Sequence, residues 1–272
     1  MTIYEKFSLE GKTSLVTGGA GLLGREFART LAEAGSLVFL ADLDQKSVDS
    51  AIEGMNNLAG KVYGLALDVT QPESVEKAVD EIASVTGRLD VLVNSAALDP
   101  KFDPEHPHKI DNAFEHYPLK QWEQGLDVNL TGVFLVTQAV CRLMVKQGSG
   151  SIINLCSTYG LVGPDQRVYD NPGQQKIYKP VFYSVSKAGI LGFTRYLAAY
   201  YAGSRIRVNA LTPGGVDNNH EERFVSNYSA RTILGRMAQK DEMNGALLFL
   251  ASDASSYMTG GNLVVDGGWT AW

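Results

Sequence analysis

The stretch TGGAGLLG at residues 17–24 follows a short β-branched run and leads directly into an amphipathic segment, REFARTLAEAG, at residues 25–35. Glycines let a backbone approach a pyrophosphate closely, and the free amides at a helix N-terminus favour its negative charge. Glycine-rich turns also serve ordinary loops, so the motif gains meaning from its place between a first strand and a first helix. In that context it predicts a dinucleotide-binding fold.

The rest of the chain alternates short β-branched runs with longer segments of helical period. This alternation is typical of a parallel sheet with helices on its faces. We therefore predict an α/β fold: a single-domain, Rossmann-type, doubly wound parallel sheet of about seven strands. The predicted strands are residues 13–17, 37–41, 62–67, 91–93, 151–155, 207–211 and 262–265. The predicted helices are residues 22–34, 45–58, 72–85, 119–146, 180–201 and 240–250.

The chain has 272 residues, 44% of them apolar, so it can bury one large core, and we expect one catalytic domain over residues 1–272. Two polar, proline-containing stretches interrupt the alternation, at residues 98–118 and 161–179. Both follow strand ends, which form the edge where open α/β sheets bind ligands. We expect them to be inserted active-site loops.

Composition excludes several classes of function. With 24 Lys and Arg against 30 Asp and Glu, the chain has no broad basic face for nucleic acid. Cys141 and Cys156 form neither a disulfide framework nor a zinc-ligand spacing, so we predict a reducing compartment and no metal site. The first residues lack a signal peptide, and no later run reaches the roughly 18 apolar residues of a membrane span. We expect a soluble cytoplasmic protein.

The second predicted strand ends in an acidic residue, Asp42, eighteen positions beyond Gly24. This is near the roughly 20-residue offset of the acid that binds the adenosine ribose in dinucleotide folds. A carboxylate there repels a 2′-phosphate, and Leu43 stands where a basic residue would have indicated NADP. The pattern favours NAD. The alternative is an ordinary strand-end Asp42 that caps the next turn.

The third and fourth predicted strands end in LALDVT, with Asp68 and Val69, and in LVNSAA, with Asn94 and Ala96. Small residues there would let a dinucleotide lie against the sheet edge. Each segment alone is also compatible with a plain strand terminus.

The segment YSVSK, residues 183–187, opens an apolar helix downstream of a strand that ends in Ser157. Residues four apart share a helix face, so the Tyr183 hydroxyl and the Lys187 ammonium can reach a common site. A tyrosine is a poor base at neutral pH, and lowering its pKa by about three units requires roughly 4 kcal/mol of preference for phenolate. A nearby lysine and an oxidised nicotinamide, both cationic, can supply it.

Together TGGAGLLG, Asp42, NSAA, Asn129 in DVNLTG, Ser157, YSVSK, the PGG after RVNALT and the closing VVDGG resemble the short-chain dehydrogenase/reductase family over nearly the whole chain. The resemblance implies that Tyr183 is the general base for alcohol oxidation, or the acid for carbonyl reduction, and that Lys187 also holds the nicotinamide ribose. It implies that Ser157 orients the reacting oxygen. Asn129 would bend its helix and anchor a water that links Lys187 to solvent. These roles agree with general acid–base catalysis beside a hydride acceptor.

Each catalytic candidate also has a purely structural interpretation. Tyr183 could be part of an amphipathic core, Lys187 a solvated side chain, Ser157 a strand-end cap and Asn129 a polar residue inside a helix. Their joint occurrence in the family's order on the expected elements favours catalysis.

The motifs and the resemblance together predict a nicotinamide cofactor, NAD, and a set of contacts to it. The predicted cofactor-binding residues are Gly18, Gly21, Leu22, Leu23, Gly24, Asp42, Leu43, Asp68, Val69, Asn94, Ala96, Tyr183, Lys187, Pro213, Gly214 and Val216. Three departures from the family's pattern leave details of these contacts open. Leu22 replaces the middle glycine of the turn, NSAA replaces NNAG, and Asn218 stands where a threonine often touches the nicotinamide amide or the pyrophosphate.

The substrate prediction rests on the 25 residues between Ser157 and Tyr183, a longer connection than the family generally carries. They are rich in Asp, Asn and Gln, a hydrogen-bonding set suited to a polyhydroxylated ligand. We hypothesise a sugar or sugar derivative. Arg167 could grip a phosphate, sulfonate or carboxylate, or form a salt bridge at the rim. The predicted substrate-binding residues are Ser157, Tyr159, Arg167, Tyr183, Gly215 and Asn218.

Two C-terminal features complete the prediction. The loop at residues 214–230 is a candidate lid, and its His220 is predicted to be a surface histidine because Tyr183 already transfers the proton. Trp269 and Trp272 in the tail GGWTAW suggest burial against another subunit, or packing onto the chain's own core. The resemblance implies a homotetramer, or a dimer at least.

The leading hypothesis is an NAD-dependent sugar dehydrogenase acting on a small molecule, with no nucleic-acid or membrane partner. The alternatives are a keto-reductase of a nucleotide-linked sugar in glycan assembly and a non-catalytic nucleotide-binding regulator. Retention of Ser157, Tyr183, Lys187 and Asn129 argues against the regulator.

Overall fold

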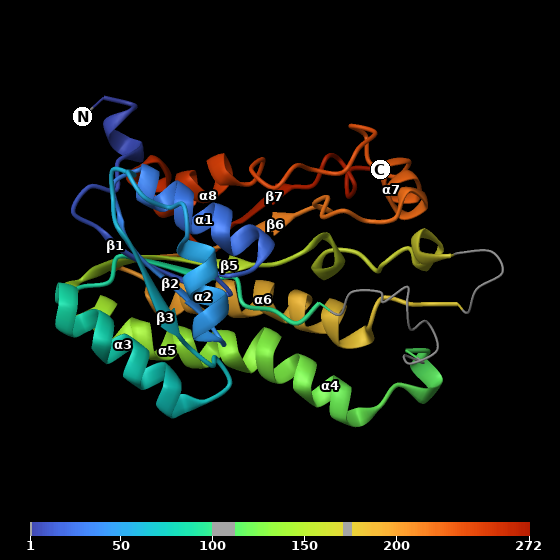
Figure 1. Ribbon diagram of the computed structural model, residues 1–272, viewed down its shortest axis with the longest axis horizontal. Helices are drawn as coiled ribbons and strands as arrows, with labels where there is room; N and C mark the ends of the chain where they lie inside the picture. The colour runs from blue at the N-terminus through green and yellow to red at the C-terminus, as the bar shows by residue number, and fades with distance from the viewer. Residues whose placement is uncertain (1, 100–111, 171–175) are drawn as a thin grey trace.

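Seven parallel strands form one sheet in the order β3-β2-β1-β4-β5-β6-β7 (Figure 1). A computed structural model describes residues 2–99, 112–170 and 176–272. The strand order reverses beside β1, which pairs with β2 on one side and β4 on the other. The predicted α/β Rossmann-type class is confirmed. The strands are β1 (Thr13–Thr17), β2 (Leu37–Asp42), β3 (Val62–Ala66), β4 (Val91–Asn94), β5 (Ser149–Leu155), β6 (Arg205–Pro213) and β7 (Asn262–Val265).

Helices cover both faces of the sheet, with α1 and α8 on one side and α3, α5 and α6 on the other (Figure 1). Phe27 and Leu247 belong to the core under the first layer, and Ile82 and Met144 to the core under the second. The helices are α1 (Leu22–Glu33), α2 (Gln45–Ile52), α3 (Pro72–Thr86), α4 (Leu119–Leu126), η4 (Asp127–Gly132), α5 (Val133–Gln147), α6 (Val181–Tyr200), α7 (Glu222–Ser229) and α8 (Asn244–Ala251). The short 3-10 turns are η1 (Glu5–Phe7), η3 (Phe114–His116), η5 (Thr158–Gly160), η6 (Gln166–Tyr169) and η7 (Asp253–Ser255).

Local chemistry explains where several helices begin. The Asp44 side chain accepts a hydrogen bond of 2.9 Å from the Ser47 amide and so caps α2, while Pro72 occupies the first turn of α3, where no amide hydrogen is needed. Both starting positions agree with the prediction from the sequence.

The predicted helices differ from the structure most in four places. The segment predicted as a helix over 45–58 ends at Ile52, because Gly54 and Asn57 adopt left-handed backbone angles with φ of 78° and 62°. The segment predicted as one helix over 119–146 contains a π-helical insertion, η4. The last helix starts at Asn244 rather than at residue 240. Helix α7 lies where only a loop was predicted.

Strand boundaries differ less from the prediction. The first and last strands match it, and the others differ at their ends; β5 and β6 each begin two residues earlier than predicted. Parts of both predicted loop insertions, residues 100–111 and 171–175, lie outside the described residues.

The helical stretch Leu119–Gln147 is long and apolar enough to cross a membrane by length and composition alone. Half of its most apolar window is buried inside the protein. Val136, Val140 and Met144 pack into the core beneath the sheet. The stretch is therefore a core helix of the fold.

Candidate active site

The glycine turn after β1 is built for close backbone approach. Gly18 has φ of 63°, and a Cβ added to it would lie 2.6 Å from the Ala96 Cα atom. A Cβ added to Gly24 would lie 2.1 Å from the Gly18 carbonyl oxygen. Leu22 begins α1, so its backbone is helical and needs no glycine. The departure at Leu22 therefore leaves the turn intact.

The N-terminus of α1 is free to take an anion. Gly21 is the N-cap residue, and no side chain among the described residues caps it. The amides of the first helical turn have no intrahelical partner, and the helix dipole is positive there. These residues fit the pyrophosphate of a dinucleotide, since the turn combines open donors with a tight backbone packing that a Cβ at Gly18 or Gly24 would disrupt.

Asp42 joins this turn to the end of β2. Its Oδ2 accepts from the Ala20 amide at 2.9 Å and its Oδ1 from the Leu43 amide at 2.8 Å. The carboxylate is thus held at the position expected for the adenosine ribose. One basic side chain that the sequence reasoning missed also contacts the turn: Arg25 donates from Nε to the Ala20 carbonyl at 2.8 Å.

The ends of β3 and β4 complete the sheet edge. Asp68 accepts from the amide and hydroxyl of Thr70 at 2.9 and 2.7 Å, so it stabilises the turn after β3, and the neighbouring Val69 is buried. Asn94 is buried and donates to the Asn154 side-chain oxygen at 2.8 Å, joining β4 to β5. The Asn94 Oδ1 is buried without a hydrogen-bond partner among the described residues.

Ser157, Tyr183 and Lys187 meet at this edge. Ser157 is the second residue after β5, and the other two lie in the first turns of α6. The Ser157 side chain lies close enough to Tyr183 to oppose the rise in the Tyr183 pKa that burial causes. The Lys187 Nζ atom lies 5.8 Å from the Tyr183 ring centroid and donates to the Leu155 carbonyl at 2.8 Å. The structure therefore brings together the three side chains that the sequence singled out.

The protein groups alone do not lower the pKa of Tyr183. Burial raises the pKa of Tyr183, the negative charge of Asp99 raises it further, and the Ser157 side chain opposes them. Burial lowers the pKa of Lys187 to about 8. The predicted lowering of the Tyr183 pKa depends on the lysine together with an oxidised nicotinamide and stays a prediction; in the protein by itself burial outweighs the contribution of Ser157.

Asn129 lies within the π-helical segment η4 and is fully buried. Its side-chain oxygen accepts from the Leu98 amide at 2.6 Å, and its side-chain nitrogen donates to the Leu98 carbonyl at 3.0 Å. This pair of bonds fixes the chain after β4 against the helix. The irregular helix agrees with the predicted bend, and the role of Asn129 in holding a water stays a prediction.

An aromatic cluster stands around Tyr183, and the sequence analysis missed it. The Tyr169 hydroxyl lies 3.2 Å from the Tyr159 hydroxyl. The Trp269 ring stacks on Tyr228 at 4.3 Å and meets Tyr159 edge-on at 6.2 Å. The cluster combines rings from η5, η6, α6, α7 and the C-terminal segment, so no local sequence pattern predicts it.

The two C-terminal tryptophans have different environments. Trp269 is buried within its own chain, which is the second of the two alternatives that the sequence left open. Trp272 is exposed, and its indole nitrogen donates to the Arg231 carbonyl at 3.1 Å. The C-terminus consequently lies beside α7 (Figure 1).

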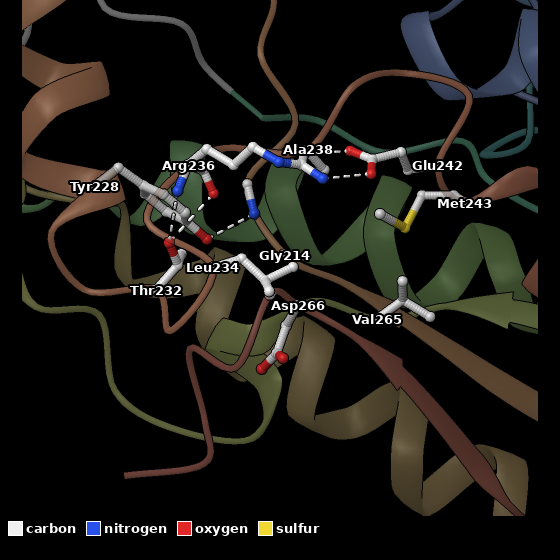
Figure 2. A pocket seen from close by; sticks show the side chains of 12 residues that line it. Gly214, Tyr228, Thr232, Leu234, Arg236, Ala238, Glu242, Met243, Val265 and Asp266 are labelled. Atoms are coloured by element: carbon white, nitrogen blue, oxygen red, sulfur yellow. Dashed lines mark hydrogen bonds and ion pairs between the residues drawn. The ribbon is translucent and has the colours of Figure 1, made fainter.

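The segment after β6 is held by Tyr228. The Gly215 amide donates to the Tyr228 hydroxyl at 2.6 Å, and a Cβ on Gly215 would lie 2.5 Å from that ring. Behind this segment is a hollow of about 60 Å³, with the Arg236–Glu242 ion pair at its edge (Figure 2). The other lining residues are Gly214, Thr232, Leu234, Ala238, Met243, Val265, Asp266 and Gly267.

The remaining residues of this segment make local contacts. Pro213 ends β6, and Val216 forms an isolated parallel bridge with Ala238. The Asn218 amide donates to His220 Nδ1 at 3.2 Å. The His220 ring packs on Phe224 at 5.0 Å, at the start of α7.

Arg167 forms the rim salt bridge. Its Nε and Nη2 atoms both lie 2.8 Å from the Asp165 carboxylate, its side chain is 74% exposed, and Asp165 also pairs with Arg231. Of the two roles left open for Arg167, the structure shows the ion pair with Asp165.

Comparisons with known proteins agree with this fold. The family model described as enoyl-(acyl carrier protein) reductase matches residues 19–270. A 3-oxoacyl-(acyl carrier protein) reductase of Thermotoga maritima is 36% identical over 264 residues, covering 96% of this chain and 98% of the relative. A D-threitol dehydrogenase of Mycolicibacterium smegmatis is 34% identical over 269 residues, covering 97% and 95%. The crystal structure of a gluconate 5-dehydrogenase from Burkholderia cenocepacia, in complex with NADP and tartrate, superimposes with a TM-score of 0.84 at 29% identity and full coverage of both chains.

Fold, site and comparisons define the class of protein: an oxidoreductase that acts on a hydroxyl or carbonyl group. The chain belongs to the short-chain dehydrogenase/reductase family. The cofactor typical of this family is a nicotinamide dinucleotide, NAD or NADP.

Proposed function

We propose that this enzyme is an NAD-dependent dehydrogenase of a polar, sugar-like alcohol. The observation that carries the proposal is the meeting of Ser157, Tyr183 and Lys187 beside a glycine turn at the carboxyl edge of the sheet. Open α/β sheets bind their ligands at that edge, next to the strand where the order reverses.

Bound nicotinamide supplies the hydride acceptor for alcohol oxidation and the hydride donor for carbonyl reduction. The Ser157 hydroxyl holds the reacting oxygen. In its phenolate form, which burial disfavours and the positive charges of Lys187 and an oxidised nicotinamide would favour, Tyr183 takes the hydroxyl proton. Lys187, whose pKa is about 8, carries a proton at neutral pH and supplies positive charge beside the phenol. The same groups return the proton when the reaction runs backwards, so they serve either direction.

The preference for NAD rests on Asp42. Its carboxylate is held by the Ala20 and Leu43 amides, and a second anion placed beside it would be repelled. Arg25 is the opposing feature, because its guanidinium contacts the same turn and could pair with a phosphate. We infer that Asp42 dominates, since a ribose diol can donate to its carboxylate and a 2′-phosphate cannot.

The proposal of a polyhydroxylated substrate rests on the phenol hydroxyls of Tyr159, Tyr169 and Tyr228 in the wall around Tyr183. Aromatic faces pack against the C–H surface of a sugar ring while the hydroxyls hydrogen-bond to its oxygens. The relative named for threitol and the related structure that holds tartrate are consistent with a small polar ligand.

We also propose that the enzyme is a homo-oligomer. Phe134 and Val145 on α5 are exposed apolar residues eleven positions apart, which is three helical turns. Val185, Tyr196 and Tyr200 form a similar exposed stripe on α6. Exposed apolar residues on two helices favour burial against a second subunit. Light scattering of the wild type and of a Val145→Lys, Tyr200→Lys variant tests this, with a smaller species expected for the variant.

The test of the enzymatic proposal is to follow NADH absorbance while polyols, sugars and sugar acids are offered with NAD. We expect a polyhydroxylated alcohol to be oxidised, and Tyr183→Phe to lose at least a hundredfold of that activity because general-base catalysis contributes about 10²–10⁴. Tyr257→Phe, at a fully exposed tyrosine, is the matched control. Full activity in Tyr183→Phe would overturn the proposed mechanism.

A further inference from the structure

A second lysine lies over the catalytic phenol. The Lys179 Nζ atom is 4.1 Å from the Tyr183 ring centroid and 6.0 Å from the Tyr159 ring centroid. It forms an ion pair with Asp99, which lies 80 positions earlier in the chain. Lys179 immediately precedes α6, whereas Asp99 follows β4, so the fold alone brings them together.

This pair differs from an ordinary surface salt bridge. The Lys179 side chain is only 12% exposed, while Asp99 is 48% exposed. An exposed ion pair contributes little, about 0–1 kcal/mol, and a lysine normally keeps its ammonium in water. Here the ammonium is held against two phenol rings, and the Lys179 backbone is fixed by a 2.8 Å bond from its amide to Gln166 Oε1. The positive charge of Lys179 is therefore held beside Tyr183, although removing the ammonium from water costs hydration free energy.

The catalytic proposal does not use this pair, because Lys187 already occupies the position one turn after Tyr183 on α6. An ammonium has three donors and a carboxylate only acceptors. One Lys179 donor is directed to Asp99, and the half-exposed carboxylate keeps free lone pairs. The pair therefore presents a donor and an acceptor side by side next to Tyr183.

We propose that Lys179 and Asp99 form a clamp for one hydroxyl of the substrate, on the carbon next to the one that reacts. This neighbouring hydroxyl accepts from Lys179 and donates to Asp99. A monohydric alcohol would leave the remaining donors of Lys179 and the remaining lone pairs of Asp99 without substrate partners. An anionic substituent would gain little, because Asp99 already balances the lysine charge. This inference rests on the proposed function and makes Lys179 and Asp99 specificity-determining residues.

The experiment compares two alcohols that differ in one hydroxyl, 1,2-cyclopentanediol and cyclopentanol, together with threitol. We expect the wild type to favour the diols, and Lys179→Met to lower kcat/KM for them about tenfold to a hundredfold through KM, which is what a charged hydrogen bond contributes. Activity on cyclopentanol falls by a smaller factor than activity on the diols, because cyclopentanol has no second hydroxyl for Lys179 to hold. Lys179→Arg, which keeps the charge and the donors, retains most of the diol activity.

Lys176→Met is the matched control, because this lysine lies on the same segment but is placed over Tyr178 rather than over Tyr183. Thermal unfolding of each variant identifies any loss of fold. If Lys179→Met lowers activity on cyclopentanol and on the diols equally, the clamp is wrong. If the wild type oxidises the diol and the mono-alcohol equally well, the clamp also fails although the dehydrogenase proposal stands. If no alcohol in the panel forms NADH, both fail.

A second variant should shift the substrate preference towards an anionic substrate. Asp99→Asn leaves the Lys179 ammonium without its balancing charge, so we expect the ratio of kcat/KM for threonate over threitol to rise at least fivefold, from an added charge-assisted hydrogen bond. An unchanged ratio would mean that Lys179 does not face the substrate.

Discussion

The Gly215 amide donates to the Tyr228 hydroxyl at 2.6 Å, which ties the segment after β6 to helix α7. The side chain of Thr158, the neighbour of Ser157, opposes the rise in the Tyr228 pKa that burial causes, and the Tyr228 ring stacks on Trp269 at 4.3 Å. One phenol therefore joins the predicted cofactor segment, the catalytic serine loop and the C-terminal segment. Helix α7 is a structural support for the site as well as a candidate lid.

Removing that hydroxyl should weaken cofactor binding. In Tyr228→Phe the ring stays but the buried Gly215 amide loses its acceptor, at a cost of about 1–3 kcal/mol. We expect the dissociation constant for NAD, measured by fluorescence titration, to rise about tenfold, and unfolding stability to fall by about 1 kcal/mol. The exposed Tyr257→Phe change should alter neither. Unchanged NAD affinity would show that Gly215 does not position the cofactor.

Replacing Asp42 should change the choice of cofactor. Asp42→Ala removes the carboxylate that accepts from Ala20 and Leu43, and leaves Arg25 as the charged side chain at that turn. We expect the ratio of kcat/KM for NAD over NADP to fall at least tenfold, because NAD loses the hydrogen bonds of its ribose to the carboxylate and NADP is no longer repelled by it. In the double variant Asp42→Ala, Arg25→Ala, the increase in kcat/KM for NADP should disappear. A wild type that already prefers NADP would refute the role given to Asp42.

The glycine turn and an open helical glycine provide a matched pair. Gly24→Ala places a Cβ 2.1 Å from the Gly18 carbonyl oxygen, so the backbone of the turn must move. We expect the free energy of unfolding to fall by about 1–3 kcal/mol and NAD binding to be lost. Gly192→Ala in α6 meets nothing within 4 Å, and should stabilise the protein by about 0.5–1 kcal/mol. Urea unfolding and NAD titration measure both. Tight NAD binding by Gly24→Ala would contradict the proposed phosphate site.

Stability should depend on pH through Lys187. Burial lowers its pKa from the ordinary 10.5 to about 8, so between these values the unfolded chain binds more protons than the folded one. The contribution of Lys187 to the free energy of unfolding therefore rises with pH across that window, and its penalty is fully present below pH 8. We expect the stability of Lys187→Met relative to the wild type to be greatest at pH 7 and to shrink towards pH 10.

Urea unfolding at several pH values between 7 and 10 measures this difference, with Lys77→Met, at an exposed lysine, as the control for loss of one charge. The free energy of unfolding is plotted against pH for Lys187→Met and for the wild type. If the two plots stay parallel over the whole range, the Lys187 pKa is not lowered in the folded protein.

The parts of the site that could be predicted are those carried by short motifs. The glycine turn, Asp42 and the Tyr183–Lys187 pair each lie within a few residues of a strand end or a helix start, where spacing alone fixes the geometry. The end of α2 was mispredicted because apolar periodicity continues past Ile52 while the backbone at Gly54 turns left-handed. The π-helical turn at Asn129 also has no signal in the periodicity.

What the sequence by itself determined is the class: strands and helices of the right period, a glycine turn in the right place, and catalytic side chains one helical turn apart. Only the tertiary structure decided what surrounds Tyr183. The aromatic wall, the Lys179–Asp99 pair and the raised Tyr183 pKa arise from residues on separate elements. The physical reason is that helical and strand periodicity is a local property of the sequence. Burial and charge pairing depend instead on which segments, far apart in the sequence, pack together in the folded protein.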